Sequence, residues 1–275
     1  FGQFLPGKHH LFFMVGSGKC AELIARVEPL LHTAGFDLVA PLEAGWYNAE
    51  EHIAPLPDCH KLPGPAGALC LLVANTGAVW EPFLRWTADR LDKEPTWLDS
   101  PQDALDQYTV EVVQRAVSAS GIAGAQVVYA YETLEKEGRS VSVTTAAHVA
   151  GLAHYHQESQ RSVHARFGPW IAYRALIVFP SLLDCLGSPP AAPADPCSSA
   201  EWQRVGELQR VCFEQWDETE EQLNWKRLVE IVEAFQLGKE YKYTPEQLHF
   251  HYQPDELLRA RHLRRCAVPE LVTGT

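Results

Sequence analysis

Two strongly apolar runs constrain the fold of this 275-residue chain more than any other feature. ALCLLVANT, residues 68–76, begins with a continuous apolar run of the length of one strand and predicts a buried strand. WIAYRALIVF, residues 170–179, is rich in aromatic and β-branched residues and predicts a core strand. With 46% hydrophobic residues, the chain can build a sizeable core, in one large domain or in one domain with an appended lobe.

Helical periodicity and turn signals place the other elements around these two strands. Ser100 and Pro101 have the residue types of an N-cap and a first helical position. Helices are predicted over residues 20–35, 79–92 and 100–120. FDLVAPL predicts a further strand at 36–42, residues 45–67 predict a loop, and AQVVYAYETL with RSVSVTT predicts a hairpin around KEG.

The last third of the chain changes in composition. GSPPAAPADPCSSAE, at 187–201, is Pro-rich and predicts a linker. Helices are predicted over 200–237 and again from Thr244, where Gln247 would complete a capping box. The pattern as a whole predicts an α+β fold, in which helices flank a mixed sheet and a helical lobe follows. We expect a main domain over 20–185, a linker with a helical cap over 186–265, and residues 1–19 that are flexible or foreign to the natural chain.

Charge and cysteine content exclude several classes of protein. A net charge of -12 and a pI near 5.4 disfavour a nucleic-acid partner. No apolar run is long enough to span a bilayer, so no membrane association is expected. The seven cysteines are odd in number, scattered and without a CxxC pair. They predict neither a disulfide framework nor a zinc site, and a reducing, cytoplasmic location fits best.

Two motifs invite a catalytic or metal-binding interpretation that the residues do not support. GSGKC, at 16–20, lacks the first glycine and the Ser or Thr that a phosphate-binding loop needs. His154 and His156 form an HxH pair, as do His249 and His251. HxH side chains share a face on a strand but not on a helix, and both stretches are predicted to be helical. Pocket or surface histidines are therefore favoured over a metal bound by the protein.

Arg174 stands inside the apolar run at 170–179. On a regular strand its side chain would share a face with Trp170, Ala172 and Leu176. An unpaired buried charge is costly, so this guanidinium needs an anion or a cavity for its head. A structural salt bridge and a clamp for a ligand carboxylate or phosphate are both compatible with the sequence.

The stretch TTAAHVAGLAHYHQ, residues 144–157, sets histidines and a tyrosine among small residues. We expect a helix that Thr144 or Thr145 caps. Small residues at this spacing pack a helix tightly on a sheet, but they also suit the face that receives a flat, extended ligand. The sequence leaves both interpretations open.

Several segments together resemble the CblC family of cobalamin-processing proteins. They are TAAHVAG with Tyr155 and Gln157, then HARFGPWIAYR at 164–174, and upstream GWYN at 45–48 and LPGP at 62–65, in the family's order. The resemblance runs from about Cys20 to Pro180 and weakens beyond. It implies a fold similar to flavin-dependent nitroreductases with a C-terminal cap.

The resemblance also implies an activity. Members bind cobalamin base-off in the cytosol and remove its upper axial ligand, alkyl groups by transfer to glutathione and cyanide by reduction. It implies delivery of cobalamin through the adaptor CblD, and a thiol oxidase side reaction is compatible with this chemistry. A reduced flavin, FMN or FAD, as electron source and a homodimer are left open. The alternatives are a flavin-dependent reductase and a cobalamin carrier without chemistry.

Site residues follow from the same resemblance. Arg174 matches a family arginine implicated in holding glutathione and is the expected catalytic residue. Arg259, with Arg261 as its rival, and Arg227 are expected to join it. The residues expected to contact cobalamin surround the small-residue stretch and precede the strand of Arg174: Val143, Thr144, Thr145, His148, Gly151, Tyr155, Gln157, Trp170 and Ile171.

The chain departs from the family pattern at three places. Only ESQRSV separates Gln157 from His164, where members carry a longer segment that touches cobalamin. Pro169 stands where glycine is usual, which stiffens that turn. His154 and His156 stand where members carry tyrosines, so stacking or hydrogen bonding there is expected to differ.

Overall fold

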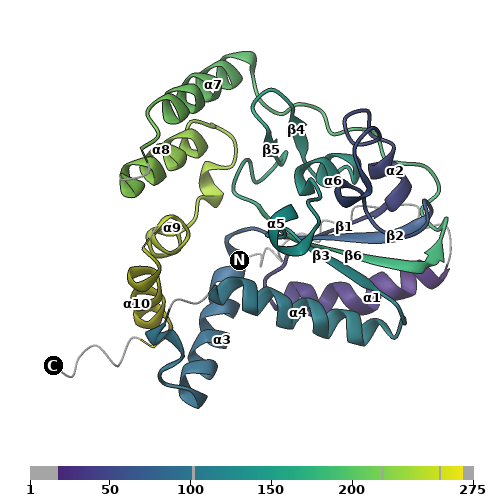
Figure 1. Ribbon diagram of the computed structural model, residues 1–275, viewed down its shortest axis with the longest axis horizontal. Coiled ribbons are helices and arrows are strands. Elements are labelled where there is room, and N and C mark those ends of the chain that lie inside the picture. The colour runs from purple at the N-terminus through teal and green to yellow at the C-terminus, as the bar shows by residue number, and fades with distance from the viewer. Residues whose placement is uncertain (1–17, 101–102, 218–219, 254, 269–275) are drawn as a thin grey trace, which may run out of the picture.

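The computed structural model describes residues 18–100, 103–217, 220–253 and 255–268. A four-stranded sheet runs in the order β1-β2-β6-β3, and β4 and β5 form a separate pair (Figure 1). The strands are β1 (Leu38–Glu43), β2 (Ala68–Asn75), β3 (Gln126–Tyr129), β4 (His154–His156), β5 (Arg161–Val163) and β6 (Ala172–Leu183). Every one of these pairings is antiparallel. The predicted combination of helices and a sheet is confirmed, but the predicted mixed sheet is wrong.

Helices account for most of the remaining described chain. The long ones are α1 (Gly18–Thr33), α3 (Trp80–Lys93), α4 (Ala104–Ser120), α7 (Ser199–Glu214), α8 (Glu221–Glu233), α9 (Pro245–Tyr252) and α10 (Glu256–Ala267). The short ones are α2 (Ala44–Asn48), α5 (Leu134–Glu137) and α6 (Val143–Val149). None of the described helices is both long and apolar enough to cross a membrane.

Strand β2 is apolar from Ala68 to Ala74 because helices cover both faces of the sheet. All eight of its side chains are buried. Leu69 and Leu71 pack in one core cluster with α1, α3 and α4. Cys70 and Leu72 pack in a second cluster with α2 and α6. Successive side chains of a strand point to opposite faces, and Figure 1 shows α1 and α4 on one side of the sheet and α2 and α6 on the other.

The helices after the linker line one side of the molecule, from α7 to α10 (Figure 1). They do not share a single core. Helices α7 and α8 enclose a small apolar cluster with Val163 of β5. Phe250 of α9 and Leu263 of α10 instead belong to the core that α3 and α4 form on the main sheet. Helix α9 begins after Thr244, whose hydroxyl accepts from the Gln247 N–H as the sequence predicts. The domain boundaries stay a prediction.

Several local predictions are wrong. The predicted loop at 45–67 contains most of α2, and the helix predicted over 200–237 is divided into α7 and α8. In the predicted hairpin only β3 forms; helix α5 occupies 134–137, and the segment 139–142 forms no strand. Helix α4 begins at Ala104 with Asp103 at its N-cap position, three residues later than the Ser100 signal. Pro101 lies outside the described residues, as do the first 17 residues of the chain.

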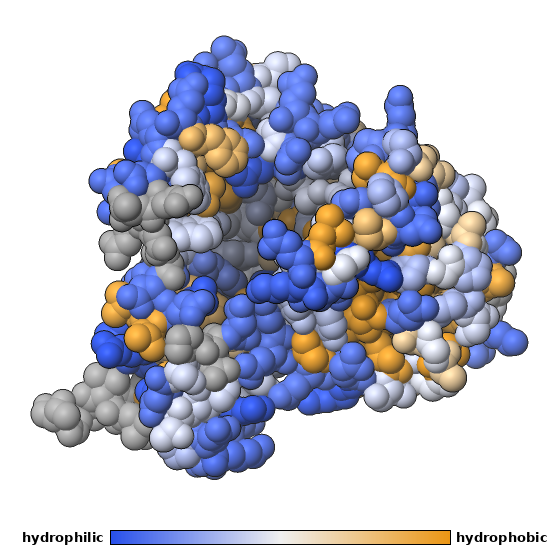
Figure 2. Space-filling model, viewed as in Figure 1, coloured by the Kyte–Doolittle hydropathy of each residue, from blue (hydrophilic) through white to orange (hydrophobic). Residues whose placement is uncertain are grey.

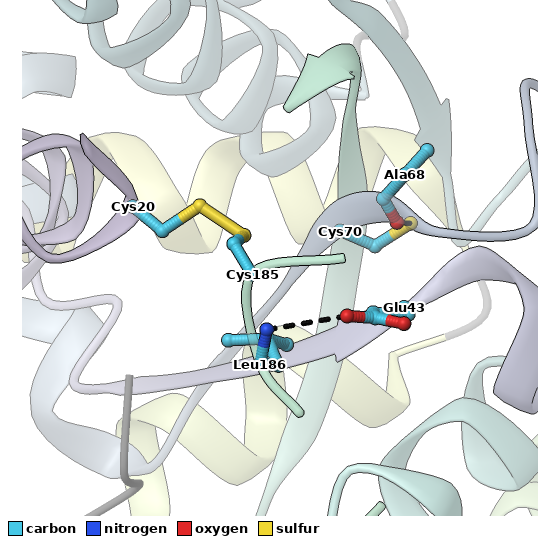
Figure 3. The surroundings of a disulfide bond; sticks show 6 residues. All are labelled: Cys20, Glu43, Ala68, Cys70, Cys185 and Leu186. Carbon is cyan, nitrogen blue, oxygen red and sulfur yellow. Dashed lines mark hydrogen bonds between the residues drawn. A yellow bond between two sulfur atoms is a disulfide. The ribbon is translucent and has the colours of Figure 1, made fainter. Parts of the chain in front are cut away.

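Cys20 of α1 and Cys185, just beyond β6, form a disulfide (Figure 3). Both side chains are buried. Next to it, the Leu186 N–H donates to Glu43 Oε1 at 3.2 Å, which fixes the segment after β6 against β1 (Figure 3). The expectation of unpaired cysteines is wrong for this pair. Disulfides persist in oxidising surroundings. This bond therefore argues against the predicted cytoplasmic location, which stays a prediction.

Removal of the disulfide should destabilise the fold. It joins residues 165 positions apart, so it constrains the unfolded chain strongly. We expect the double substitution Cys20→Ser with Cys185→Ser to lower the free energy of unfolding by about 2–5 kcal/mol. Urea unfolding with and without a reductant measures the effect. Cys197→Ser, at an unpaired cysteine, is the control; equal midpoints for oxidised and reduced wild type would contradict the prediction.

Candidate functional site

Helix α6 carries the first group of predicted site residues, and GWYN holds its start in place. Ser142, not Thr144 or Thr145, is the N-cap, and its hydroxyl accepts from the Thr145 N–H at 3.3 Å. The Ser142 N–H in turn donates to the hydroxyl of Tyr47 at 2.9 Å. Tyr47 is fully buried, and its own hydroxyl donates to His60 O at 3.1 Å. Burial raises the pKa of this phenol to about 12, so it stays a neutral donor at the helix start.

The small residues of the stretch 144–157 pack on protein. Ala146, Ala147 and Ala150 are fully buried in the core cluster on the α6 face of the sheet. The helix ends at Val149, and Gly151 adopts a left-handed φ of 71°. A Cβ on Gly151 would lie 3.1 Å from Pro190 of the linker. Tight packing on the sheet is therefore what these alanines do, and the predicted helix through residue 157 is wrong beyond Val149.

Three residues predicted to contact cobalamin, Thr145, His148 and Tyr155, lie close together. His52, which the sequence analysis did not identify, connects two of them. His52, from the loop after α2, has its Nε2 3.0 Å from the Thr145 hydroxyl, and its ring stacks on Tyr155 at 6.2 Å. The Tyr155 N–H donates to His148 Nδ1 at 3.1 Å. Burial, followed by the neighbouring His154, lowers the pKa of His148. Thr145, His148 and Tyr155 thus form one polar group around the end of α6.

The HxH pair at 154 and 156 lies on strand β4, not on a helix as predicted. Both rings contact Trp202 of α7. His156 stacks on Trp202 of α7 at 3.9 Å, and His154 Nδ1 lies 3.2 Å from the Pro193 carbonyl. Within the described ranges, no group of three His, Cys, Asp or Glu side chains is arranged to hold a metal ion.

The other predicted cobalamin contacts are dispersed. Val143 and Ile171 pack half-buried against the core cluster of α6. The Thr144 hydroxyl lies 3.2 Å from that of Ser142, and Gln157 is exposed. Trp170 is buried, and its ring meets Tyr243 edge-on at 5.6 Å. Trp170 therefore belongs with the group around Arg174 described next.

Arg174 is the extra residue of a β-bulge. On β2, Ala74 pairs with Tyr173 and Val73 pairs with Ala175, so Arg174 has no partner opposite it. Bulges re-aim side chains, often beside functional sites. The predicted shared face with Leu176 is therefore wrong: the Arg174 Nε donates to Asn75 Oδ1, at the end of β2, at 2.6 Å. Asn75 is fully buried, and its amide donates to Thr76 O.

Charged and aromatic groups from three other elements surround this guanidinium. Burial lowers the pKa of Arg174, while Tyr243 and Asp106 of α4 oppose the shift. Arg259 of α10 lies close enough to act on the same Asp106. No carboxylate among the described residues comes within the 4.0 Å of an ion pair with Arg174. The structural salt bridge is thus absent from this part of the chain, and the anion clamp is favoured.

Helix α9 presents two unsatisfied polar atoms among these residues. His251 Nε2 and Gln247 Nε2 are buried and have no hydrogen-bond partner within the described chain. Burial, with Arg174 and Arg259, lowers the pKa of His251 to about 3. Buried polar groups are rarely left unpaired, so these atoms indicate a site for a polar guest. The sequence signal was weak, because His251 appeared only as half of an HxH pair.

Arg227 lies apart from this group. Its guanidinium donates to the carbonyl of Gln215 at 2.5 Å and to the side chain of Gln215 at 2.9 Å, at the end of α7. The structure thus brings Arg259 toward Arg174 but keeps Arg227 on the surface between α7 and α8. Arg261, the rival of Arg259, is exposed on α10.

The surface is hollowed in two places. Figure 2 shows a broad hollow between the α7–α8 pair and the α5–α6 side of the molecule. A separate cavity of about 500 Å³ lies between α8 and α9, lined by Trp225, His249 and Tyr252 among others. None of the predicted cobalamin contacts lines this second cavity.

Comparison with known proteins identifies the family. The model of the methylmalonic aciduria and homocystinuria type C family, MMACHC, matches residues 35–246. The chain belongs to this family. A Danio rerio MMACHC relative, named cyanocobalamin reductase / alkylcobalamin dealkylase, is 30% identical over 221 residues, which cover 74% of this chain and 82% of the relative. The human protein of the same name is 30% identical over 212 residues, covering 71% and 69%.

A solved structure supports the fold of this MMACHC family member. It is the crystal structure of a C. elegans B12-trafficking protein, CblC, described as a homologue of human MMACHC. The two superpose with a TM-score of 0.69 at 17% identity, over 90% of this chain and 96% of that chain. The resemblance drawn from the HVAG and RFG segments is confirmed at the level of family and fold. The finer likeness to nitroreductases stays a prediction.

Tyr47→Phe should destabilise the protein through the start of α6. It removes the acceptor of the Ser142 N–H and the donor to His60 O, both in the interior. We expect a loss of about 1–3 kcal/mol in the free energy of unfolding, measured by urea titration. Tyr129→Phe, which removes only a surface bond to Gln114, is the control; equal losses in the two variants would disprove the role of Tyr47.

Asp106 should make stability depend on pH. Burial, then the charge of Asp103, raises the pKa of its carboxyl to about 6, although Arg174 and Arg259 oppose the rise. Because the folded pKa lies above the unfolded value, this group lowers stability as the pH rises from about 4 to about 6. Asp106→Asn should therefore stabilise at pH 7.5 by about 1–3 kcal/mol and have little effect at pH 3.5. A gain of equal size at both values in urea unfolding would refute this.

Proposed function

We propose that this protein processes vitamin B12: it binds cobalamin base-off and removes the upper axial ligand. It dealkylates alkylcobalamins with glutathione and decyanates cyanocobalamin by reduction. Membership of a family whose relatives are named cyanocobalamin reductase / alkylcobalamin dealkylase carries this proposal. The arrangement around Arg174 supports the glutathione step, because a buried guanidinium without a carboxylate partner suits an anionic substrate.

The polar group around the end of α6 is the proposed contact surface for cobalamin. His52, His148 and Tyr155 offer imidazole and phenol groups to the amide side chains and the nucleotide tail, while the buried Thr145 holds the His52 ring through its hydroxyl. A cobalamin that has lost its lower ligand favours four-coordinate cobalt. Removal of the upper ligand is then easier, so the protein contributes by binding this form and keeping it oriented.

Glutathione would bind through its carboxylates to Arg174 and Arg259. In dealkylation, the thiolate sulfur forms a bond to the cobalt-bound carbon, and the cobalt–carbon bond breaks with its electron pair left on cobalt. The products are a thioether and cob(I)alamin. In decyanation, electrons from a thiol or a reduced flavin reduce the cobalt, and cyanide leaves. The chemistry belongs to cobalt, and the protein supplies position and electrostatics.

Further aspects of this function stay predictions. They are the use of FMN or FAD, a thiol oxidase side reaction, delivery through CblD, a homodimer and the role of Arg227. The described residues include no feature that favours a flavin over cobalamin at the site. A carrier that binds cobalamin without chemistry uses the same contacts, so the experiment has to separate binding from turnover.

An anaerobic absorption spectrum with methylcobalamin, before and after glutathione is added, tests the proposal. We expect a shift to the base-off form, then conversion to cob(I)alamin together with the methyl thioether of glutathione. The shift without conversion would indicate a carrier. A protein that leaves the methylcobalamin and cyanocobalamin spectra unchanged would refute the proposal.

Arg174→Gln should separate the two substrates. Because Arg174 is assigned to glutathione, we expect the variant to keep the base-off shift of cobalamin. Its dealkylation rate at a fixed subsaturating glutathione concentration should fall by about 100-fold, because loss of a buried charge-assisted contact costs about 2–3 kcal/mol. Arg210→Gln, at an exposed arginine paired with Glu214, is the control. An Arg174→Gln protein with the wild-type rate would dismiss this role.

A further inference from the structure

The His251 imidazole makes ring contacts but leaves a buried nitrogen without a hydrogen bond in the described part of the chain. Its Nε2 is buried and unpartnered among the described residues. The ring is fixed between the rings of Tyr243 at 5.2 Å and Phe250 at 5.5 Å. Leaving a buried ring nitrogen unpaired costs free energy, and such costs persist where a ligand later removes them.

A second unsatisfied polar atom belongs to Gln247, on the same helix α9. Gln247 lies one helical turn before His251 and is 1% exposed. Its Nε2 also lacks a partner within the described chain, while its Oε1 faces the backbone of Gly77 just beyond β2. Two unpaired nitrogens on one helix face, beside Arg174 and Asn75, point to a polar molecule between α9 and the end of β2.

The charges around His251 define what it can do there. Arg174 of β6 and Arg259 of α10 face it, together with the phenol of Tyr243. Burial and the two arginines lower its pKa to about 3, so at neutral pH the ring is uncharged and carries one N–H. A ring in this state is a poor acceptor for a further proton and a good neutral hydrogen-bond donor.

We propose that His251 donates a hydrogen bond from Nε2 to the sulfur of bound glutathione and, with Arg174 and Arg259 nearby, holds that sulfur as a thiolate. This inference rests on the proposed function and adds to it the group that activates the nucleophile. The guanidinium groups take the carboxylates of the tripeptide, and the remaining buried N–H takes the sulfur. Neighbouring cations lower the pKa of a thiol.

The proton of the thiol goes to solvent, and His251 stays neutral throughout. The thiolate lone pair then forms the sulfur–carbon bond to the alkyl group, and the electron pair of the cobalt–carbon bond reduces Co(III) to Co(I). A free thiol with a pKa of about 8.5 is only a few per cent thiolate at pH 7. Holding the sulfur as thiolate is therefore worth about 30-fold in rate at that pH.

The test is the pH dependence of methylcobalamin dealkylation at saturating glutathione between pH 6 and 9.5. For wild type we expect a rate that is already near its maximum at pH 7. His251→Leu should be slower at pH 7, by at most about 30-fold because the two arginines remain, and should approach the wild-type rate near pH 9.5. His251→Gln, which places an amide N–H where Nε2 lies, should keep most of the rate at pH 7. His249→Ala, the other histidine of the HxH pair, is the matched control.

A uniform loss across the pH range in His251→Leu would show a structural role and overturn the inference, as would a wild-type profile in that variant. The pKa of the bound thiol gives a readout that does not depend on any variant. The 13C shift of the cysteinyl β-carbon of labelled glutathione on wild type should titrate at least one pH unit below free glutathione; titration at the free value overturns the inference. A wild type that binds cobalamin but transfers no methyl group refutes the proposed function itself.

Discussion

The hydrogen bond between the Arg174 guanidinium and Asn75 organises the candidate site of this molecule. It is possible only because β6 bulges at Arg174, which directs the side chain toward the end of β2 instead of into the core cluster of Leu176. The bond uses Nε and leaves the two terminal nitrogens without a carboxylate partner in the described chain. A buried cation of this kind costs free energy in the empty protein. Proteins retain a buried charge of this cost where it binds a substrate.

The rest of the fold holds the elements around Arg174 in place. Helices cover both faces of the sheet, and the buried phenol of Tyr47 fixes the start of α6 by accepting from Ser142. The disulfide between Cys20 and Cys185 ties the far end of β6 to α1. Helices α9 and α10 pack on the main core through Phe250 and Leu263. They thereby bring His251 and Arg259 to Arg174 from a region nearly eighty residues later in the sequence.

Sequence patterns predicted the features that depend on residues close together in the chain. The apolar runs identified β2 and β6, and the order of GWYN, HVAG and RFG segments identified the family. Contacts between distant segments could not be predicted in the same way. The bulge at Arg174 depends on pairing with β2, the disulfide joins distant positions, and His52 reaches Thr145 from a loop 93 residues away. Small residues in the stretch 144–157 were ambiguous, because close packing on a sheet and close approach of a ligand require the same side chains.

Arg174 is proposed to hold the tripeptide beside the cobalamin. A crystal structure of the protein with cob(II)alamin and S-methylglutathione, the product of methyl transfer, tests it most directly. We expect a carboxylate of the tripeptide on the terminal nitrogens of Arg174, with the Nε bond to Asn75 intact and the sulfur facing the corrin. An Arg174 closed onto Asp106, with the tripeptide bound elsewhere, would contradict it.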